Sequence, residues 1–123
     1  MGDADKRGEF MELQQKLLQT SHQLRQMERQ AVQHSTDMRR AKLIVAEVGP
    51  LPDNVIMYKN VGRAYMMEAK GAVIQSYEGK AASAQASIEN LKSAADKVQE
   101  LAKSTKQDME ELLRTYPNLL KAQ

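Results

Sequence analysis

The chain has 123 residues, of which 41% are apolar and 4% aromatic, with a single Phe and no Trp. A compact core made from this composition would be thin, so we expect one domain, residues 1–123, that is elongated or joins an assembly. The 18 basic and 16 acidic residues are spread along the chain, which argues against a nucleic-acid partner that needs a concentrated basic surface.

The absence of cysteine excludes a disulfide framework and thiol chemistry, and it fits a reducing compartment. No apolar run approaches the roughly 20 residues that span a bilayer. The charged start MGDADKRGE also differs from a signal peptide. We therefore expect a cytoplasmic protein with no membrane partner.

A long first helix is predicted over about 10–48, a stretch that contains neither Gly nor Pro. Side chains in it recur at alternating steps of three and four, which is the pattern of a heptad seam. The predicted seam consists of Phe10, Leu13, Leu17, Thr20, Leu24, Met27, Ala31, His34, Met38, Ala41, Val45 and Val48. Packing is expected to be weaker at its two polar positions, Thr20 and His34.

A break and a β-hairpin are predicted next, in the region 53–67. The sequence Gly49-Pro50-Leu51-Pro52 ends the helix, because Pro has no amide donor and restricts the residue before it. Two short β-favouring runs follow, over 55–58 and 61–67, and Lys59-Asn60 between them is the predicted turn.

A second helix is predicted over 68–116, followed by a tail over 117–123. Its seam consists of Tyr77, Ala81, Ala84, Ile88, Leu91, Ala95, Val98, Ala102, Thr105, Met109, Leu112 and Tyr116. Gly71 and Gly79 each cost up to about 1 kcal/mol in a helix relative to Ala, so a bent or late start is expected. Pro117 ends the helix.

The two seams predict a mainly α fold, with two long helices that form an antiparallel coiled coil joined by a β-hairpin. Pairing them outward from the bend places Leu24 opposite Ala102 and Leu13 opposite Leu112. Phe10 then meets Tyr116 at the open end.

Apolar residues that the seams do not use cluster at the bend and at the open end, and such residues need a partner or face water. An isolated hairpin is marginally stable, so the bend is a candidate oligomerisation site. The residues proposed for it are Val55, Met57, Tyr58, Val61, Gly62, Arg63, Tyr65 and Met67. The residues proposed for binding at the tips are Phe10, Met11, Leu113, Tyr116, Leu119 and Leu120. The simpler alternatives are fraying of the termini and, near the bend, packing of four helical residues on their own hairpin: Leu43, Ile44, Val73 and Ile74.

No catalytic or cofactor pattern is found in the sequence. His22 and His34 do not have the spacing of metal ligands, and no phosphate-binding glycine loop is present. The adjacent Glu110 and Glu111 point in different directions on a helix, which makes them poor partners for acid and base catalysis. We expect a non-enzymatic binding subunit without cofactor or metal; a structural scaffold or tether and a weak nucleic-acid binder are the alternatives.

The stretch Met57-Tyr58-Lys59-Asn60-Val61-Gly62-Arg63-Ala64-Tyr65-Met66, set between a Pro-rich break and a helix that starts near Glu68-Ala69-Lys70, resembles the β-class subunits of prefoldin. The likeness covers the whole chain in layout, and residues 55–75 carry its specific part. The chain departs from the family at Pro117-Asn118, where the family helix usually continues.

This resemblance implies a hexamer of two α-class and four β-class subunits, whose hairpins join into β-barrels above coiled-coil arms. The tips of such arms hold unfolded client proteins, especially actin and tubulin chains. The complex passes these clients to the cytosolic chaperonin without using ATP.

Overall fold

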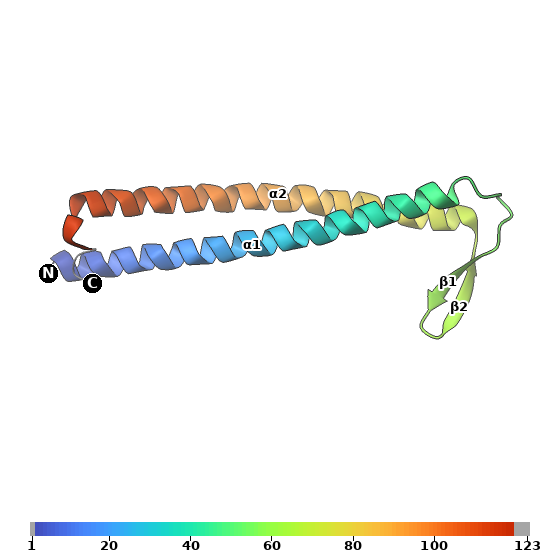
Figure 1. The fold of residues 1–123 in the computed structure, drawn as a ribbon, viewed down its shortest axis with the longest axis horizontal. Helices are drawn as coiled ribbons and strands as arrows, with labels where there is room; N and C mark the ends of the chain where they lie inside the picture. Colours follow the sequence, from blue (N-terminus) through green and yellow to red (C-terminus); the bar gives the residue numbers. More distant parts are fainter. Residues whose placement is uncertain (1, 120–123) are drawn as a thin grey trace. The chain divides into compact units, whose positions relative to one another are not determined.

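The computed structural model describes residues 2–119, with side chains from residue 4 onward. Helix α1 spans Gly2–Val48, strands β1 and β2 span Met57–Val61 and Ala64–Glu68, and helix α2 spans Lys70–Thr115 (Figure 1). A 3₁₀ turn, Pro117–Leu119, follows α2. The predicted fold class, two long helices with an antiparallel two-stranded hairpin between them, is confirmed.

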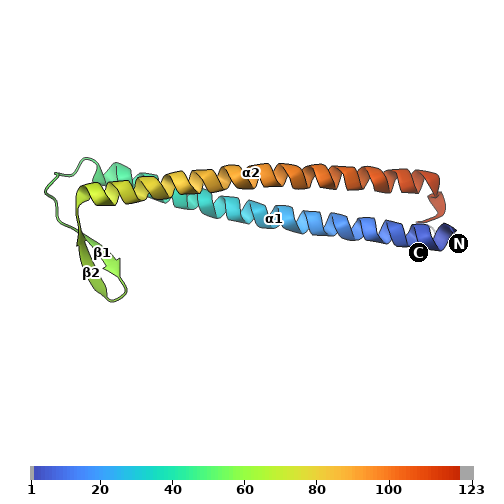
Figure 2. The ribbon, with the colours of Figure 1, turned by 180° about the vertical axis from the view of Figure 1, so that it is seen from behind.

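The chain forms two compact units, each made of a segment of α1 and a segment of α2. The terminal unit contains residues up to Arg29 together with those from Leu91 onward, and the hairpin unit contains Gln30–Asn90. In the terminal unit the two helical segments are antiparallel, because Leu24 lines a groove with Ala102 whereas Leu13 lines another with Leu112. This is the arrangement that the predicted pairing requires, and Figure 2 shows it from behind.

Every predicted seam residue of both helices is buried or half-buried. Large apolar residues away from the seams are exposed instead, among them Leu18, Val32 and Leu101. Because residues three and four apart share one helix face, the heptad spacing alone determines which side chains are covered.

The two threonines of the seams are buried without leaving a polar group unpaired. Thr20 and Thr105 are each 3% exposed. The Thr20 hydroxyl donates to the Leu17 carbonyl at 2.9 Å, and the Thr105 hydroxyl donates to the Leu101 carbonyl at 2.9 Å. Each helix therefore satisfies its own buried hydroxyl, which removes most of the cost of placing Thr in a seam.

Helix α1 starts earlier than the sequence pattern predicted, at Gly2 rather than near Phe10. Asp5 lies in the first turn of the helix, and an acidic residue near a helix N-terminus is stabilising. Helix α2 starts at Lys70, two residues after the predicted 68, and it continues through both Gly71 and Gly79. Buried Val73 and Ala81 pack beside them, and such packing outweighs a weak local propensity.

The connection after α1 is held to the start of α2 by Lys70. The Lys70 ammonium donates to the Leu51 carbonyl at 2.7 Å and to the Asp53 carboxylate at 3.3 Å. The amide of Gly49 closes the last turn of α1 by donating to the Val45 carbonyl at 2.9 Å. One lysine thus fixes where the chain leaves the first helix and enters the hairpin region.

The turn of the hairpin lies at Gly62-Arg63 and not at Lys59-Asn60, which the structure places inside β1. Val61 pairs with Ala64, which leaves a two-residue loop. Gly62 has φ of 62°, whereas no described non-glycine residue has a positive φ. Gly at the first loop position followed by a residue with negative φ is the arrangement of a type II′ turn, whose twist matches that of the strands.

Replacing Gly62 by Val is expected to destabilise the hairpin by about 1–2 kcal/mol, because a β-branched residue is strained at this φ. No atom lies within 4 Å of the position that a Cβ would occupy, so the cost comes from the backbone alone. Asn tolerates this conformation, and Gly62→Asn is the matched control. Amide hydrogen exchange across Tyr58–Met67 measures the effect; equal protection in the two variants would contradict it.

Candidate functional site

The two faces of the hairpin differ in composition because side chains alternate along each strand. The register pairs Tyr58 with Met67 and Asn60 with Tyr65, and these four residues form one face, which we call the tyrosine face. The opposite face, which we call the lysine face, consists of Met57, Lys59, Val61, Ala64, Met66 and Glu68.

The tyrosine face is the less covered of the two. Tyr58, Tyr65 and Met67 are 64%, 73% and 66% exposed. The lysine face is partly covered at its root, where Met57 and Glu68 are half-buried, and its Lys59 ammonium lies 3.9 Å from the Glu68 carboxylate. Two aromatic rings and a Met left in water are therefore the most conspicuous feature of the hairpin unit.

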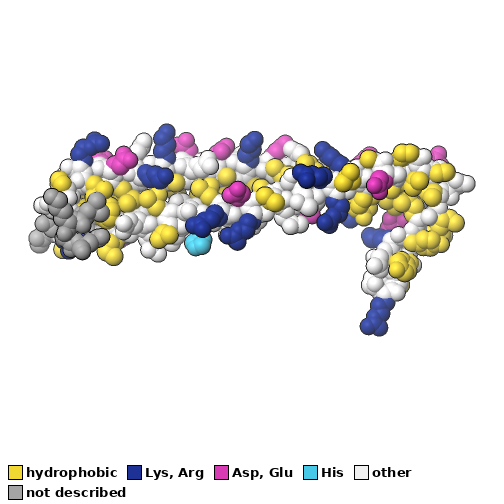
Figure 3. All heavy atoms as spheres, in the orientation of Figure 1, with side chains coloured by type: hydrophobic (Ala, Val, Ile, Leu, Met, Phe, Trp, Pro, Cys, Tyr) yellow, Lys and Arg dark blue, Asp and Glu magenta, His cyan; other side chains and the backbone are white. Residues whose placement is uncertain are grey.

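Both strands of the hairpin have a free edge, since the sheet formed by the described residues consists of β1 and β2 alone. Each free edge presents backbone donors and acceptors that a strand from another chain can pair with. Figure 3 shows hydrophobic side chains gathered where the hairpin joins the helices of its unit. The hairpin thus combines unpaired edges with exposed apolar faces, which are the two properties of a strand-docking surface.

The structure places most of the residues predicted for oligomerisation on the hairpin. Met57, Tyr58 and Val61 lie on β1, and Tyr65 and Met67 lie on β2. Gly62 and Arg63 form the exposed turn, and Val55 precedes β1, with its amide donating to the Pro52 carbonyl at 3.1 Å.

Two exposed apolar residues of the same region were missed by the sequence reasoning. Ile56 is 65% exposed and Met66 is 57% exposed. The alternation of the strands could have indicated Met66, which faces the same side as Val61.

At the open end of the terminal unit, several predicted tip residues are covered. Phe10 is 2% exposed and Leu119 is 3% exposed. Tyr116 is half-buried, and the Lys6 ammonium lies 5.7 Å from the centre of its ring. In Figures 1 and 2 the chain turns after α2 back toward the start of α1, which accounts for the burial of Leu119.

Other tip residues are accessible to a partner. Met11 is 59% exposed and Leu113 is half-buried, whereas Leu120 lies outside the described residues. Leu18, which the sequence places among the surplus apolar residues toward the open end, is 58% exposed. It lines a shallow groove of about 760 Å³ together with Met11, Leu24, Ala102 and Met109.

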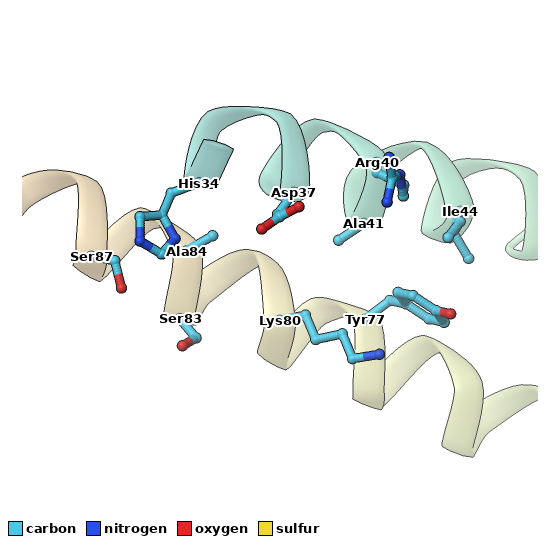
Figure 4. A pocket seen from close by; sticks show the side chains of 10 residues that line it. All are labelled: His34, Asp37, Arg40, Ala41, Ile44, Tyr77, Lys80, Ser83, Ala84 and Ser87. Carbon is cyan, nitrogen blue, oxygen red and sulfur yellow. The ribbon is translucent and has the colours of Figure 1, made fainter. Parts of the chain in front are cut away.

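A second groove, of about 420 Å³, lies between the helices of the hairpin unit (Figure 4). The small side chains of Ala41 and Ala84 leave room there, while His34 and Ser87 lie at one end and Tyr77 lies at the other. The Lys80 ammonium is 4.5 Å from the Tyr77 ring centre, which suits a cation–π contact. The Asp37 carboxylate accepts a hydrogen bond from the Gln33 amide at 3.1 Å.

Neither groove contains the ligand set of a metal centre. Within residues 2–119, no three His, Cys, Asp or Glu side chains are grouped closely enough to hold a metal ion. The described helices also include none that is long and apolar enough to cross a membrane. The exposed apolar residues of the hairpin and of the terminal groove make these two surfaces the candidate site.

Comparison with known proteins identifies the family of the chain that carries these surfaces. A sequence profile described as prefoldin subunit matches residues 11–116, which include the hairpin, the second seam and all of the first seam except Phe10. The chain belongs to the prefoldin subunit family. This membership confirms the predicted class of function, that of a co-chaperone subunit, and prefoldin subunits assemble with one another.

Individual relatives agree with the family match. Prefoldin subunit 1 of Arabidopsis thaliana is 27% identical over 119 residues, which cover 97% of this chain and 93% of the relative. Prefoldin subunit 1 of Danio rerio is 27% identical over 99 residues, covering 80% of this chain and 73% of the relative. The crystal structure of the prefoldin beta subunit from Thermococcus strain KS-1 has a similar fold, with a TM-score of 0.78. That likeness has 21% identity and covers 86% of this chain and 93% of the solved one.

Proposed function

We propose that the chain is a β-class subunit of a hexameric prefoldin complex that contains two α-class and four β-class subunits. The complex captures unfolded proteins of the actin and tubulin type at its coiled-coil tips and delivers them to the cytosolic chaperonin in the cytoplasm. It does so without ATP, cofactor or catalysis, and without a nucleic-acid or membrane partner.

The exposed tyrosine face is the observation that carries this proposal. A two-stranded hairpin with Tyr58, Tyr65 and Met67 in water is unfavourable alone, whereas hairpins from several chains cover one another and pair their edges. Assembly therefore converts the exposed face into a shared core. A scaffold or tether built from two helices has no need of such a face.

The thin core of the hairpin unit supports the same proposal. Its buried apolar residues are small ones: Ala41, Val48, Val73, Ala81 and Ala84. Burial of apolar area contributes roughly 25 cal/mol per Å², so small side chains stabilise the unit little. Contacts with partner subunits would supply the apolar burial that the chain itself lacks.

Weak contacts at several tips suit the capture of a flexible client, because linked contacts raise the overall affinity without a deep pocket. The accessible groups for such contacts are Met11 and Leu18, which line the groove of the terminal unit. A Met side chain adapts to varied partners because it is unbranched and flexible. Phe10 and Leu119 are covered, so they would contact a client only after the turn at Pro117–Leu119 moves away.

Changing Met11 and Leu18 to Ser is expected to weaken client holding while assembly is unaffected, because both side chains are exposed in the folded chain. The measurement is light scattering of chemically denatured actin diluted into the assembled complex without ATP. Loss of these contacts should reduce suppression of aggregation several-fold. Val32→Ser, which changes an exposed apolar residue of the hairpin unit, is the control. Aggregation could be suppressed equally by complexes that contain the unchanged chain, the Met11 and Leu18 variant or the Val32→Ser variant. That result would show that Met11 and Leu18 do not contact the client.

A further inference from the structure

One side of α1 in the hairpin unit carries exposed apolar residues that neither seam uses. Leu43 is 57% exposed and Val32 is 62% exposed, whereas the seam residues of the same helix are buried or half-buried. A shallow groove of about 460 Å³ runs along this side, and all of its lining comes from α1. We call it the outer α1 groove; its lining is Ser35, Met38, Arg39, Lys42, Leu43 and Ala46.

The two charged residues that line this groove, Arg39 and Lys42, are both positive, and the exposed acidic Glu47 follows the last lining residue. Arg39 and Lys42 are exposed and lie among the apolar side chains of Leu43 and Ala46. Neither cation takes part in an ion pair within the described part of the chain. Asp37 lies on nearly the opposite side of the helix from Arg39, because two residues turn an α-helix by about 200°. It faces the other groove of the unit.

The groove has the dimensions and chemistry of a helix-docking site. From Ser35 to Ala46 it extends about 16 Å at 1.5 Å per residue, which is three turns of a bound helix. A helix docks in such a groove with apolar residues spaced three and four apart. Carboxylates beside that apolar stripe would meet Arg39 and Lys42, and Arg pairs with a carboxylate in charge-assisted, bidentate hydrogen bonds.

We propose that the outer α1 groove binds an acidic amphipathic helix of a partner protein. A lipid surface fits less well, because membrane-bound helices bury a wide apolar face and this helix has already buried its seam against α2. The surface is separate from the hairpin edges and from the terminal groove. The proposal therefore does not depend on how the chain assembles or on which clients it holds.

The test uses the full chain in complex with the partner subunits that it assembles with, and a photo-crosslinking residue in place of Leu43. The probe is a synthetic peptide of about 20 residues, long enough to form a helix, with Leu at alternating steps of three and four and Glu beside them. A matched peptide has Lys in place of every Glu. Fluorescence anisotropy gives the affinities, and the crosslink gives the location.

We expect the acidic peptide to crosslink at position 43 and to bind at least about tenfold more tightly than the basic one. The pair Arg39→Glu and Lys42→Glu should weaken its binding by at least about tenfold, because both charge-assisted contacts become repulsive. The control pair Lys92→Glu and Lys103→Glu makes the same change of net charge at exposed positions of α2 and should leave binding unchanged.

Equal binding of the two peptides, no crosslink from the residue at position 43, or an equal loss in the control pair would overturn the proposal. Tighter binding to anionic lipid vesicles than to the acidic peptide would overturn it as well. The mass of the complex is measured in parallel for each variant. A change in that mass would show that the variant alters assembly of the complex, which is a separate matter from peptide binding at the outer α1 groove.

Discussion

Replacing Tyr58 and Tyr65 together by Ser is expected to abolish incorporation of the chain into its complex. Both rings lie on the tyrosine face and are mostly in water in the chain alone. A buried Tyr at the centre of an interface contributes about 2 kcal/mol or more, so two should weaken association by about a thousandfold. Copurification with partner subunits and sedimentation velocity measure the loss.

One further measurement and two further variants separate a lost interface from a lost fold. Helix content by circular dichroism should not change in the double Ser variant, since its side chains make few contacts within the chain. Tyr58→Phe with Tyr65→Phe keeps the aromatic area and should still assemble, as should Arg63→Ser at the exposed turn. Normal assembly of the double Ser variant would show that partners dock elsewhere.

Phe10→Ala is expected to lower the free energy of unfolding of the terminal unit by about 3 kcal/mol, because the ring is 2% exposed and its removal leaves a cavity. The neighbouring Met11→Ala is the matched control, since Met11 is 59% exposed and little is lost when it is shortened. The effects of both substitutions are measured by unfolding the assembled complex in denaturant and monitoring amide exchange in residues 4–29. Similar effects of the two substitutions would contradict the burial of Phe10.

The helical seams could be predicted from the sequence because their information is local. A side chain three or four residues from another lies on the same face whatever the rest of the chain does, so Leu13 and Leu112 could be assigned to the buried side without a structure. The hairpin could be predicted for a similar reason, from β-favouring residues around a break. The turn was misplaced, and the strand ends with it, since Lys59-Asn60 is a plausible turn until the positive φ of Gly62 is considered.

Which apolar residues are exposed at the tip and which are covered could not be predicted in the same way. Phe10 and Leu119 are far apart in sequence, and their burial depends on a 3₁₀ turn after Pro117 that no periodic pattern indicates. Pro117 predicts that α2 ends, yet it does not predict the direction that the chain takes afterwards. The sequence therefore indicated apolar residues at the tip without showing that Met11 is accessible and Phe10 is covered.

The hairpin also explains why a chain with such thin apolar packing can have a defined role. Its exposed rings are costly for an isolated molecule and useful for a subunit, because the same side chains become an interface when partners arrive. Stability and assembly are then linked, since binding that requires the folded chain stabilises it. We expect the isolated chain to unfold at a lower temperature than the chain in its complex.

We expect native mass spectrometry of the chain coexpressed with α-class and β-class prefoldin subunits to detect one species. Its mass should be that of a hetero-hexamer of two α-class and four β-class subunits that includes this chain. A stable homodimer of this chain that ignores those partners would contradict this expectation and would favour a scaffold or tether.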